Sequence, residues 1–161
     1  MSARWRALRE QRPDLAEAGR ALLYQFGVGL AFIGTVRTDG GPRLHPVCPI
    51  LSEEGLYAFV TPSLKRDDLH RDGRYALHSY PCPNNEDAFY VFGSAVLEQD
   101  PLVMETLRRA FLAERNWSQT PPASWGDQQI FELFIDRCLY TKTTGHGDFA
   151  PVHTVWRPDG R

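Results

Sequence analysis

Short apolar segments separated by turn residues constrain the fold of this chain more than any other feature of its sequence. The first three span residues 28–37, 43–51 and 56–61, and the clusters T-D-G-G-P and S-E-E-G stand between them. Connections this short join antiparallel neighbours, because a parallel crossover needs about a dozen residues or more. These segments therefore predict an antiparallel meander.

Later segments also have the composition of strands. Strands joined mainly by short turns predict an antiparallel sheet, and about six of them in one small domain favour a barrel. The predicted fold class is mostly β with flanking α-helices. The later strands are expected over residues 74–80, 88–97, 130–141 and 152–158.

Two longer helices are predicted outside the strands, besides a short one around residues 64–71. Apolar residues recur at helical spacing over 13–26, and Asp100-Pro101 is a start signal for a helix over 101–115. A chain of 161 residues is most simply one domain. We expect a single domain over 1–161, with the N-terminal helix, barrel strands over about 28–97 and 130–142, the inserted helix and a tail over 150–161.

Two neighbouring strands have unusual sequences. Segment 28–37 is apolar at nearly every position, which predicts a strand covered on both faces, and a second subunit is one candidate cover. In segment 43–51, Pro46 and Pro49 cannot donate ladder hydrogen bonds, so this strand should be bulged or lie at an edge.

The proline-interrupted strand offers a place for a planar ligand. The two-residue period puts Arg43, His45 and Val47 on one face, and backbone groups freed beside Pro46 could hydrogen-bond the polar edge of a heteroaromatic ring. The alternative is an ordinary edge strand whose Arg43 and His45 are solvated, since exposed polar residues on strands are common.

The sequence T-P-S-L-K-R-D-D-L (61–69) predicts a site for a phosphate, because it follows an apolar strand and opens a short helix. Helix N-termini carry unpaired N–H groups and partial positive charge. Ser63 is a suitable N-cap, and Lys65 adds a full charge in the first turn. The alternative is a plain cap and a surface lysine, with Asp67 and Asp68 weakening the positive field.

Composition and charge exclude several functions. A net charge of −2 and a pI of about 6.2 give no electrostatic reason to expect nucleic acid or a membrane as partner. Cys48, Cys82 and Cys138 lack C-x-x-C spacing, so neither a disulfide framework nor a metal site is predicted. No apolar run reaches transmembrane length and the N-terminus lacks a signal-peptide core, so we expect a cytoplasmic protein.

The order of these pieces resembles the pyridoxamine 5′-phosphate oxidase-like, flavin-binding split-barrel superfamily. The resemblance implies a six-stranded antiparallel split barrel and a homodimer with FMN at the subunit interface. It is carried by A-F-I-G-T-V-R-T-D-G-G-P-R-L-H-P-V (31–47), L-Y-A-F-V-T-P-S-L-K-R-D-D-L (56–69), R-D-G-R-Y-A-L-H (71–78), F-Y-V-F-G-S-A-V-L (89–97) and the tail V-W-R-P (155–158).

The resemblance also implies which residues contact the flavin. The phosphate would lie at the strand-to-helix turn, the ring would lie along the backbone of the second strand, and the tail could close over the ligand or pack on the core. The candidate residues are Thr61, Ser63, Lys65 and Arg66 for the phosphate, Arg43, His45, Pro46 and Val47 for the ring, and Trp156 in the tail.

The predicted function is an FMN-dependent oxidoreductase that acts on an unidentified small molecule. The cofactor carries the electron chemistry, so no acid–base constellation is required and no catalytic residue is assigned. A deazaflavin-dependent reductase and a non-catalytic flavin-binding or sensor protein remain open. Haem, which some superfamily members bind, needs an axial ligand such as His45, His78 or His153. The extra basic residues with which true oxidases grip their substrate's phosphate have no counterpart near this C-terminus.

Overall fold

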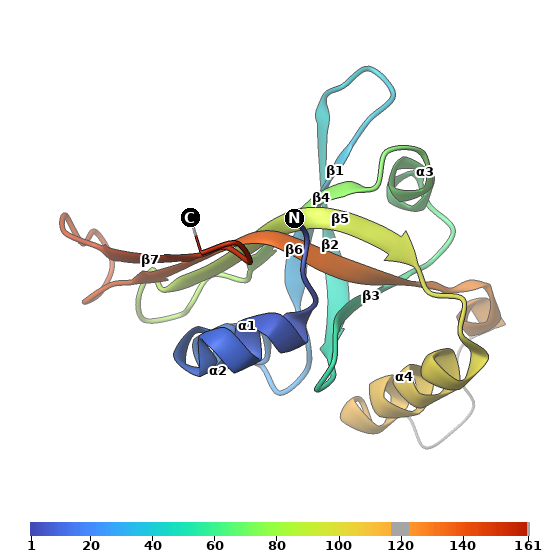
Figure 1. The fold of residues 1–161 in the computed structure, drawn as a ribbon, viewed down its shortest axis with the longest axis horizontal. Helices are drawn as coiled ribbons and strands as arrows, with labels where there is room; N and C mark the ends of the chain where they lie inside the picture. The colour runs from blue at the N-terminus through green and yellow to red at the C-terminus, as the bar shows by residue number, and fades with distance from the viewer. Residues whose placement is uncertain (117–122, 161) are drawn as a thin grey trace.

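The computed structural model describes residues 1–116 and 123–160, and its centre is an antiparallel β-barrel (Figure 1). The sheet order is β3-β2-β1-β4-β5-β6-β7, and a further pairing of β3 with β6 closes the first six strands into a ring. This confirms the predicted six-stranded antiparallel split barrel. The strands are β1 (Ala31–Val36), β2 (Pro42–Leu51), β3 (Leu56–Val60), β4 (Arg74–Ser79), β5 (Ala88–Leu97), β6 (Gln129–Lys142) and β7 (Val152–Trp156).

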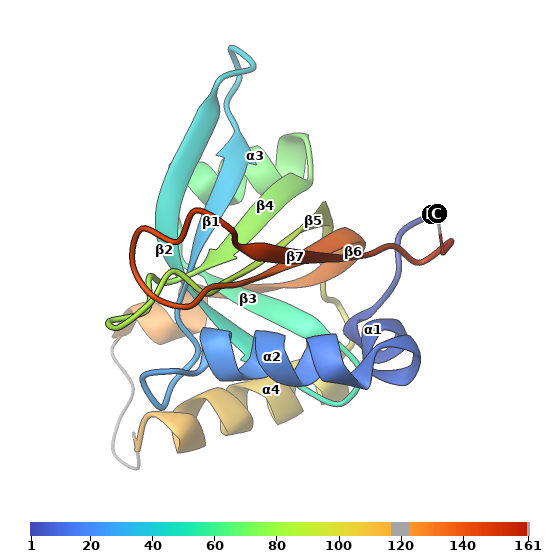
Figure 2. The same cartoon turned by 90° about the vertical axis from the view of Figure 1, so that its left-hand side faces the viewer.

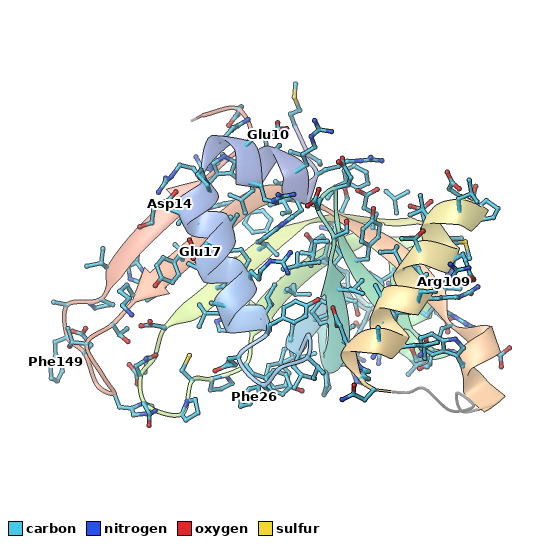
Figure 3. The ribbon with its side chains drawn as sticks, turned by 90° about the horizontal axis from the view of Figure 1, so that it is seen from below. Glu10, Asp14, Glu17, Phe26, Arg109 and Phe149 are labelled. Carbon is cyan, nitrogen blue, oxygen red and sulfur yellow. The ribbon has the colours of Figure 1, made fainter. Side chains whose placement is uncertain are left out.

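Helices cover two sides of the barrel. Figure 2 shows α2 and α4 below the barrel and α3 beyond its opposite side. Figure 3 shows Glu10, Asp14 and Glu17 along the first two helices, and Phe149 at the tip of the β6–β7 hairpin. Among the described residues, no helix is both long and apolar enough to cross a membrane. The helices are α1 (Trp5–Gln11), α2 (Pro13–Leu23), α3 (Leu64–Arg71), α4 (Pro101–Glu114) and the short 3-10 helix η1 (Ala123–Asp127).

The barrel opens along β2, because this strand changes partner halfway. Residues 42–47, which include Pro46, pair with β1, whereas residues 48–51, which include Pro49, pair with β3. Within the described sheet, each half of β2 therefore has one paired edge and one free edge. A proline is tolerated there, since its missing N–H can face the free edge. The predicted edge position is therefore confirmed for each half of β2 taken separately.

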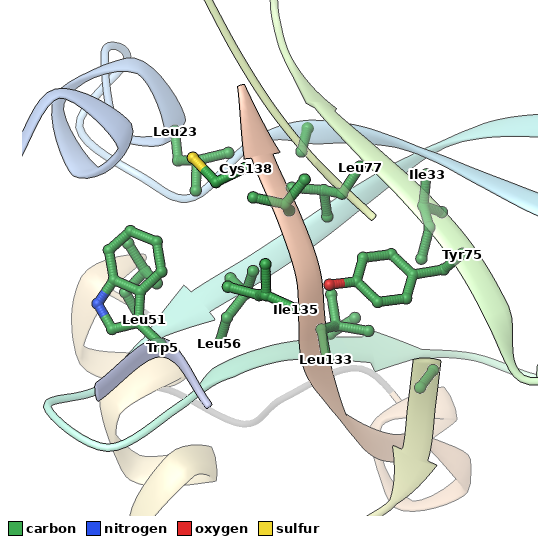
Figure 4. Packing of buried hydrophobic residues seen from close by; sticks show 14 of the residues in the cluster. Trp5, Leu23, Ile33, Leu51, Leu56, Tyr75, Leu77, Leu133, Ile135 and Cys138 are labelled. Atoms are coloured by element: carbon green, nitrogen blue, oxygen red, sulfur yellow. The ribbon is translucent and has the colours of Figure 1, made fainter. Parts of the chain in front are cut away.

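The barrel interior forms the main hydrophobic core (Figure 4). Ile33, Leu77 and Ile135 from three different strands are fully buried in it. At one end α2 packs closely on β5, because Gly19 has no side chain where the Phe89 ring lies. A Cβ at Gly19 would be 2.6 Å from that ring.

A second apolar layer fills the space between α4 and the outer face of β2, β3 and β6. Tyr57, Phe59 and Ile130 meet Leu107 and Phe111 there. The predicted helix over 101–115 is observed over 101–114. Its predicted cap is confirmed, since a side-chain oxygen of Asp100 accepts hydrogen bonds from the N–H groups of Leu102 at 2.9 Å and Val103 at 3.4 Å.

The N-terminal region differs in detail from the sequence prediction. The helix expected over 13–26 ends at Leu23, and the strand expected from residue 28 begins at Ala31. A turn separates them, with Gly27 at φ +82°, a conformation that favours glycine. Helix α1 was not predicted, because only Trp5 and Leu8 of its seven residues are buried and two positions give no periodic signal.

Candidate functional site

A pocket of about 190 Å³ lies where β3 ends and α3 begins. Its walls combine apolar and aromatic side chains with a few polar groups, as in small-molecule sites. A larger hollow of about 490 Å³ beside α1 and α2 is lined by ion-paired surface charges such as Arg6 with Glu54. The smaller pocket is lined by Leu30, Pro46, Val47, Cys48, Phe59, Thr61, Lys65, Tyr80, Phe111 and Gln128.

Four candidate residues from the sequence meet in this pocket. Pro46 and Val47 come from the proposed ring segment, and Thr61 and Lys65 from the proposed phosphate segment. The change of partner in β2 brings the two segments together, because residues 48–51 run beside β3, whose end leads into α3.

Lys65 links the two segments directly. Its Nζ donates a hydrogen bond to the backbone carbonyl oxygen of Pro46 at 3.0 Å, which uses one of the three donors of an ammonium group. Burial lowers the pKa of Lys65 below its ordinary value, although the neighbouring Cys48 acts in the opposite direction. A partly desolvated cation is stabilised by an anion, so this position favours an anionic ligand.

Ser63 is the N-cap residue of α3, but its side chain does not cap the helix. Its Oγ donates instead to the backbone carbonyl oxygen of Thr61 at 2.9 Å, inside the T-P-S turn. The capping role predicted for Ser63 is therefore wrong. The Ser63 carbonyl oxygen accepts from the N–H groups of Arg66 and Asp67. The first helical turn thus has no hydroxyl cap that an anion would have to displace.

The two candidate arginines hold secondary-structure elements together. Nη1 of Arg66 donates to the carbonyl oxygen of Asp127 at 3.0 Å, which fastens α3 to the segment just before β6. Nε of Arg43 donates to Oδ2 of Asp68 at 2.7 Å, so this side chain points from β2 to α3. Neither arginine is among the residues that line the pocket, so each acts by holding α3 to a neighbouring segment.

Asp68 is the centre of a buried polar network that sequence analysis missed. Its side chain is 3% exposed and accepts hydrogen bonds from Thr35 at 2.8 Å, Arg43 at 2.7 Å and Arg71 at 3.2 Å. Burial alone would raise the pKa of Asp68, but these bonds outweigh it and hold the pKa below its ordinary value. The network fixes α3 to β1 and β2, and with it the start of α3 beside the pocket.

Two further candidates lie outside the pocket lining. His45 is exposed on β2. Trp156 is buried on β7, where its Nε1 donates to Oε1 of Gln11 at 2.9 Å, and it borders a separate hollow with Arg137. A role for Trp156 at the flavin stays a prediction that needs a second copy of the chain.

Gln128 is a pocket residue that sequence analysis did not identify. Val60 pairs with Gln129 at the end of the β3–β6 ladder, which places Gln128 at the register position opposite Thr61. A polar residue at the end of a loop carries no recognisable signal in one sequence. Among the described residues, no group of three or more His, Cys, Asp or Glu side chains could hold a metal ion.

Comparisons with known proteins identify the fold. No protein-family model and no curated protein matches the sequence. The structure is similar to a heme-binding protein from Mycobacterium smegmatis, with a TM-score of 0.64 and 16% identity over 89% of this chain. The aligned region is 58% of that protein's length.

Two other solved structures have the same architecture. A general stress protein 26-related protein of the pyridoxinephosphate oxidase family, from Clostridium acetobutylicum, gives a TM-score of 0.59 and 12% identity over 96% of both chains. An F420 reductase gives 0.54 and 19% identity over 68% of this chain and 87% of the reductase. This chain therefore has the split-barrel fold of these proteins.

Proposed function

We propose that this protein is an FMN-binding oxidoreductase that acts on a small molecule. The flavin phosphate lies at the strand-to-helix turn Thr61–Arg66, and the ring lies along β2 at Pro46 and Val47. The hydrogen bond from Lys65 to the Pro46 carbonyl oxygen carries the proposal, because it joins the phosphate segment to the ring segment at one pocket.

The chemistry of the pocket fits such a cofactor. Phe59, Tyr80 and Phe111 offer aromatic surface to a flat ring, and the Lys65 ammonium with the start of α3 offers positive charge to a phosphate. Bound FMN would supply the electron-transfer chemistry. The chain's own contribution is to neutralise the phosphate, orient the ring through the β2 backbone and exclude water on the side covered by α4.

A second copy of the chain is part of this proposal. A pocket of about 190 Å³ is smaller than the roughly 300–1,000 Å³ usual for ligand sites, so one chain encloses only part of a flavin. The outer face of β1, β4 and β5 is half-exposed and aromatic. Phe32 stacks there on Tyr80, just beyond β4, with ring centroids 4.4 Å apart, and Tyr90 lies beside Phe92. Packing this face against its copy would complete the site. The proposal includes neither nucleic acid nor a membrane as a partner. 

A deazaflavin is the second candidate cofactor, and the likeness to an F420 reductase favours it. Both ligands combine an anionic group with a tricyclic plane, so the Lys65 site does not discriminate between them. Heme is less well matched, because none of the candidate axial histidines His45, His78 and His153 is among the residues that line this pocket. A flavin-bound protein without turnover would be a carrier or sensor.

Equilibrium titration with FMN, riboflavin and a deazaflavin, followed by fluorescence, tests the proposal. We expect FMN to bind more tightly than riboflavin, which lacks the phosphate. Lys65→Met should weaken FMN binding about tenfold and leave riboflavin binding unchanged. Lys142→Met is the matched control, since Lys142 pairs with Asp87 away from the pocket. No FMN binding, or equal FMN affinity in Lys65→Met, would contradict the proposal, and a preference for the deazaflavin would replace FMN.

A further inference from the structure

Gln128 is distinguished from its neighbours by a buried polar atom without a partner. Its Oε1 is buried and accepts no hydrogen bond from any residue that the structure describes. A buried acceptor without a donor destabilises a folded protein, so such atoms are rare and call for an explanation. The same side chain lines the pocket between α3 and α4.

The segment around Gln128 is anchored on both sides. Trp125 stacks on Phe59 with ring centroids 5.7 Å apart, and the Asp127 carbonyl oxygen accepts from Arg66. On the other side, Oε1 of Gln129 lies 2.6 Å from Nε2 of His70. The backbone is therefore fixed, and the unpaired atom does not reflect a loosely held loop. The two adjacent glutamines therefore differ: the side chain of Gln129 pairs with His70, whereas the side chain of Gln128 lines the pocket.

We infer that the side-chain amide of Gln128 is a ligand-binding group, whose oxygen accepts a hydrogen bond from a hydroxyl or ring N–H of the bound molecule. This inference rests on the proposed function and adds to it a second recognition element. Lys65 binds the anionic group, whereas the Gln128 oxygen binds an uncharged hydrogen-bond donor. A phosphate dianion has no hydrogen to donate, so this donor belongs to another part of the ligand. In a flavin the donor is a ribityl hydroxyl or the ring N–H.

Gln128→Met tests this inference, because methionine is similar in length and offers no comparable acceptor. The ligand-free variant should melt at the same temperature as the wild type or higher, since it removes an unpaired buried oxygen. Its affinity for FMN and for riboflavin should fall by the same factor, about tenfold. Gln129→Met, at the neighbouring position, is the control and should keep both affinities.

Comparing the binding of FMN, riboflavin and lumiflavin to wild type and Gln128→Met distinguishes the possible roles of Gln128. Lumiflavin, which has no ribityl chain, distinguishes the two donors: an unchanged lumiflavin affinity assigns the hydroxyl, and a weakened one assigns the ring N–H. A lower melting temperature with unchanged affinities would overturn the inference in favour of a structural role. Weaker binding of FMN alone would also overturn it, because Gln128 would then contact the phosphate. If wild-type protein bound no flavin, the proposed function would fail together with this inference.

Discussion

Replacing Asp68 by asparagine should destabilise the protein strongly, although Asp68 does not line the pocket. The substitution keeps the shape of the side chain and removes its charge. The bond from Arg43 is to a buried carboxylate, and such bonds contribute about 1.5–3 kcal/mol each. Arg71 is 37% exposed, so solvent screens its ion pair and we assign it little. With a smaller loss at Thr35, the free energy of unfolding should fall by about 3 kcal/mol.

Urea denaturation at several pH values measures this effect. In thermal denaturation, a loss of about 3 kcal/mol corresponds to a fall in Tm of about 6–12 °C for a domain of this size. Because the folded state lowers the pKa of Asp68, its contribution is complete above the unfolded-state pKa and is lost as the pH falls through the folded-state pKa. The difference between wild type and variant should therefore be largest near neutral pH and shrink below about pH 4.

Asp67→Asn is the matched control, since Asp67 is exposed in the first turn of the same helix. It should change the free energy of unfolding by less than about 1 kcal/mol. A loss of under about 1 kcal/mol for Asp68→Asn at neutral pH, or a difference that persists in acid, would refute the assignment of Asp68 as the link between α3 and the sheet.

Two further predictions concern the ligand and the second copy. Burial lowers the pKa of Lys65 in the free protein below the ordinary value of 10.5, and a bound phosphate would raise this pKa. The affinity for FMN should therefore be highest at pH values below the pKa of Lys65 in the free protein, and it should weaken as the pH rises through that pKa. Titration against pH measures this loss, and an equal loss for riboflavin would contradict it. Sedimentation should give the dimer mass for the wild type, and Phe32→Glu should shift it toward the monomer while Phe149→Glu, at a fully exposed hairpin tip, should not. A wild-type protein that sediments as a monomer would contradict the proposed dimer.

Local sequence signals predicted the strands and their turns well. The turn between β1 and β2 contains Gly40 at φ +83°, and Asp100 caps α4 as expected. These features depend on neighbouring residues in the chain, so one sequence contains the required information. The number of strands and their short turns favoured a barrel, and the resemblance then supplied its six-stranded split form.

Features that depend on contacts between distant residues were not predictable. Asp68 meets Thr35 and Arg43 across 33 and 25 positions of sequence. Ser63 looked like a helix cap, but the Thr61 carbonyl oxygen competed for its hydroxyl. Gln128 reaches the pocket through the β3–β6 pairing that closes the barrel. In each case the partner is set by strand register and helix docking, which a single sequence does not specify.

The most direct test of the central claim is a crystal structure of the protein saturated with FMN. The account predicts a phosphate oxygen within hydrogen-bond distance of Lys65 Nζ and the ring against the backbone of Pro46 and Val47. A flavin bound elsewhere on the barrel, with the pocket at the start of α3 filled by the protein's own side chains, would contradict it.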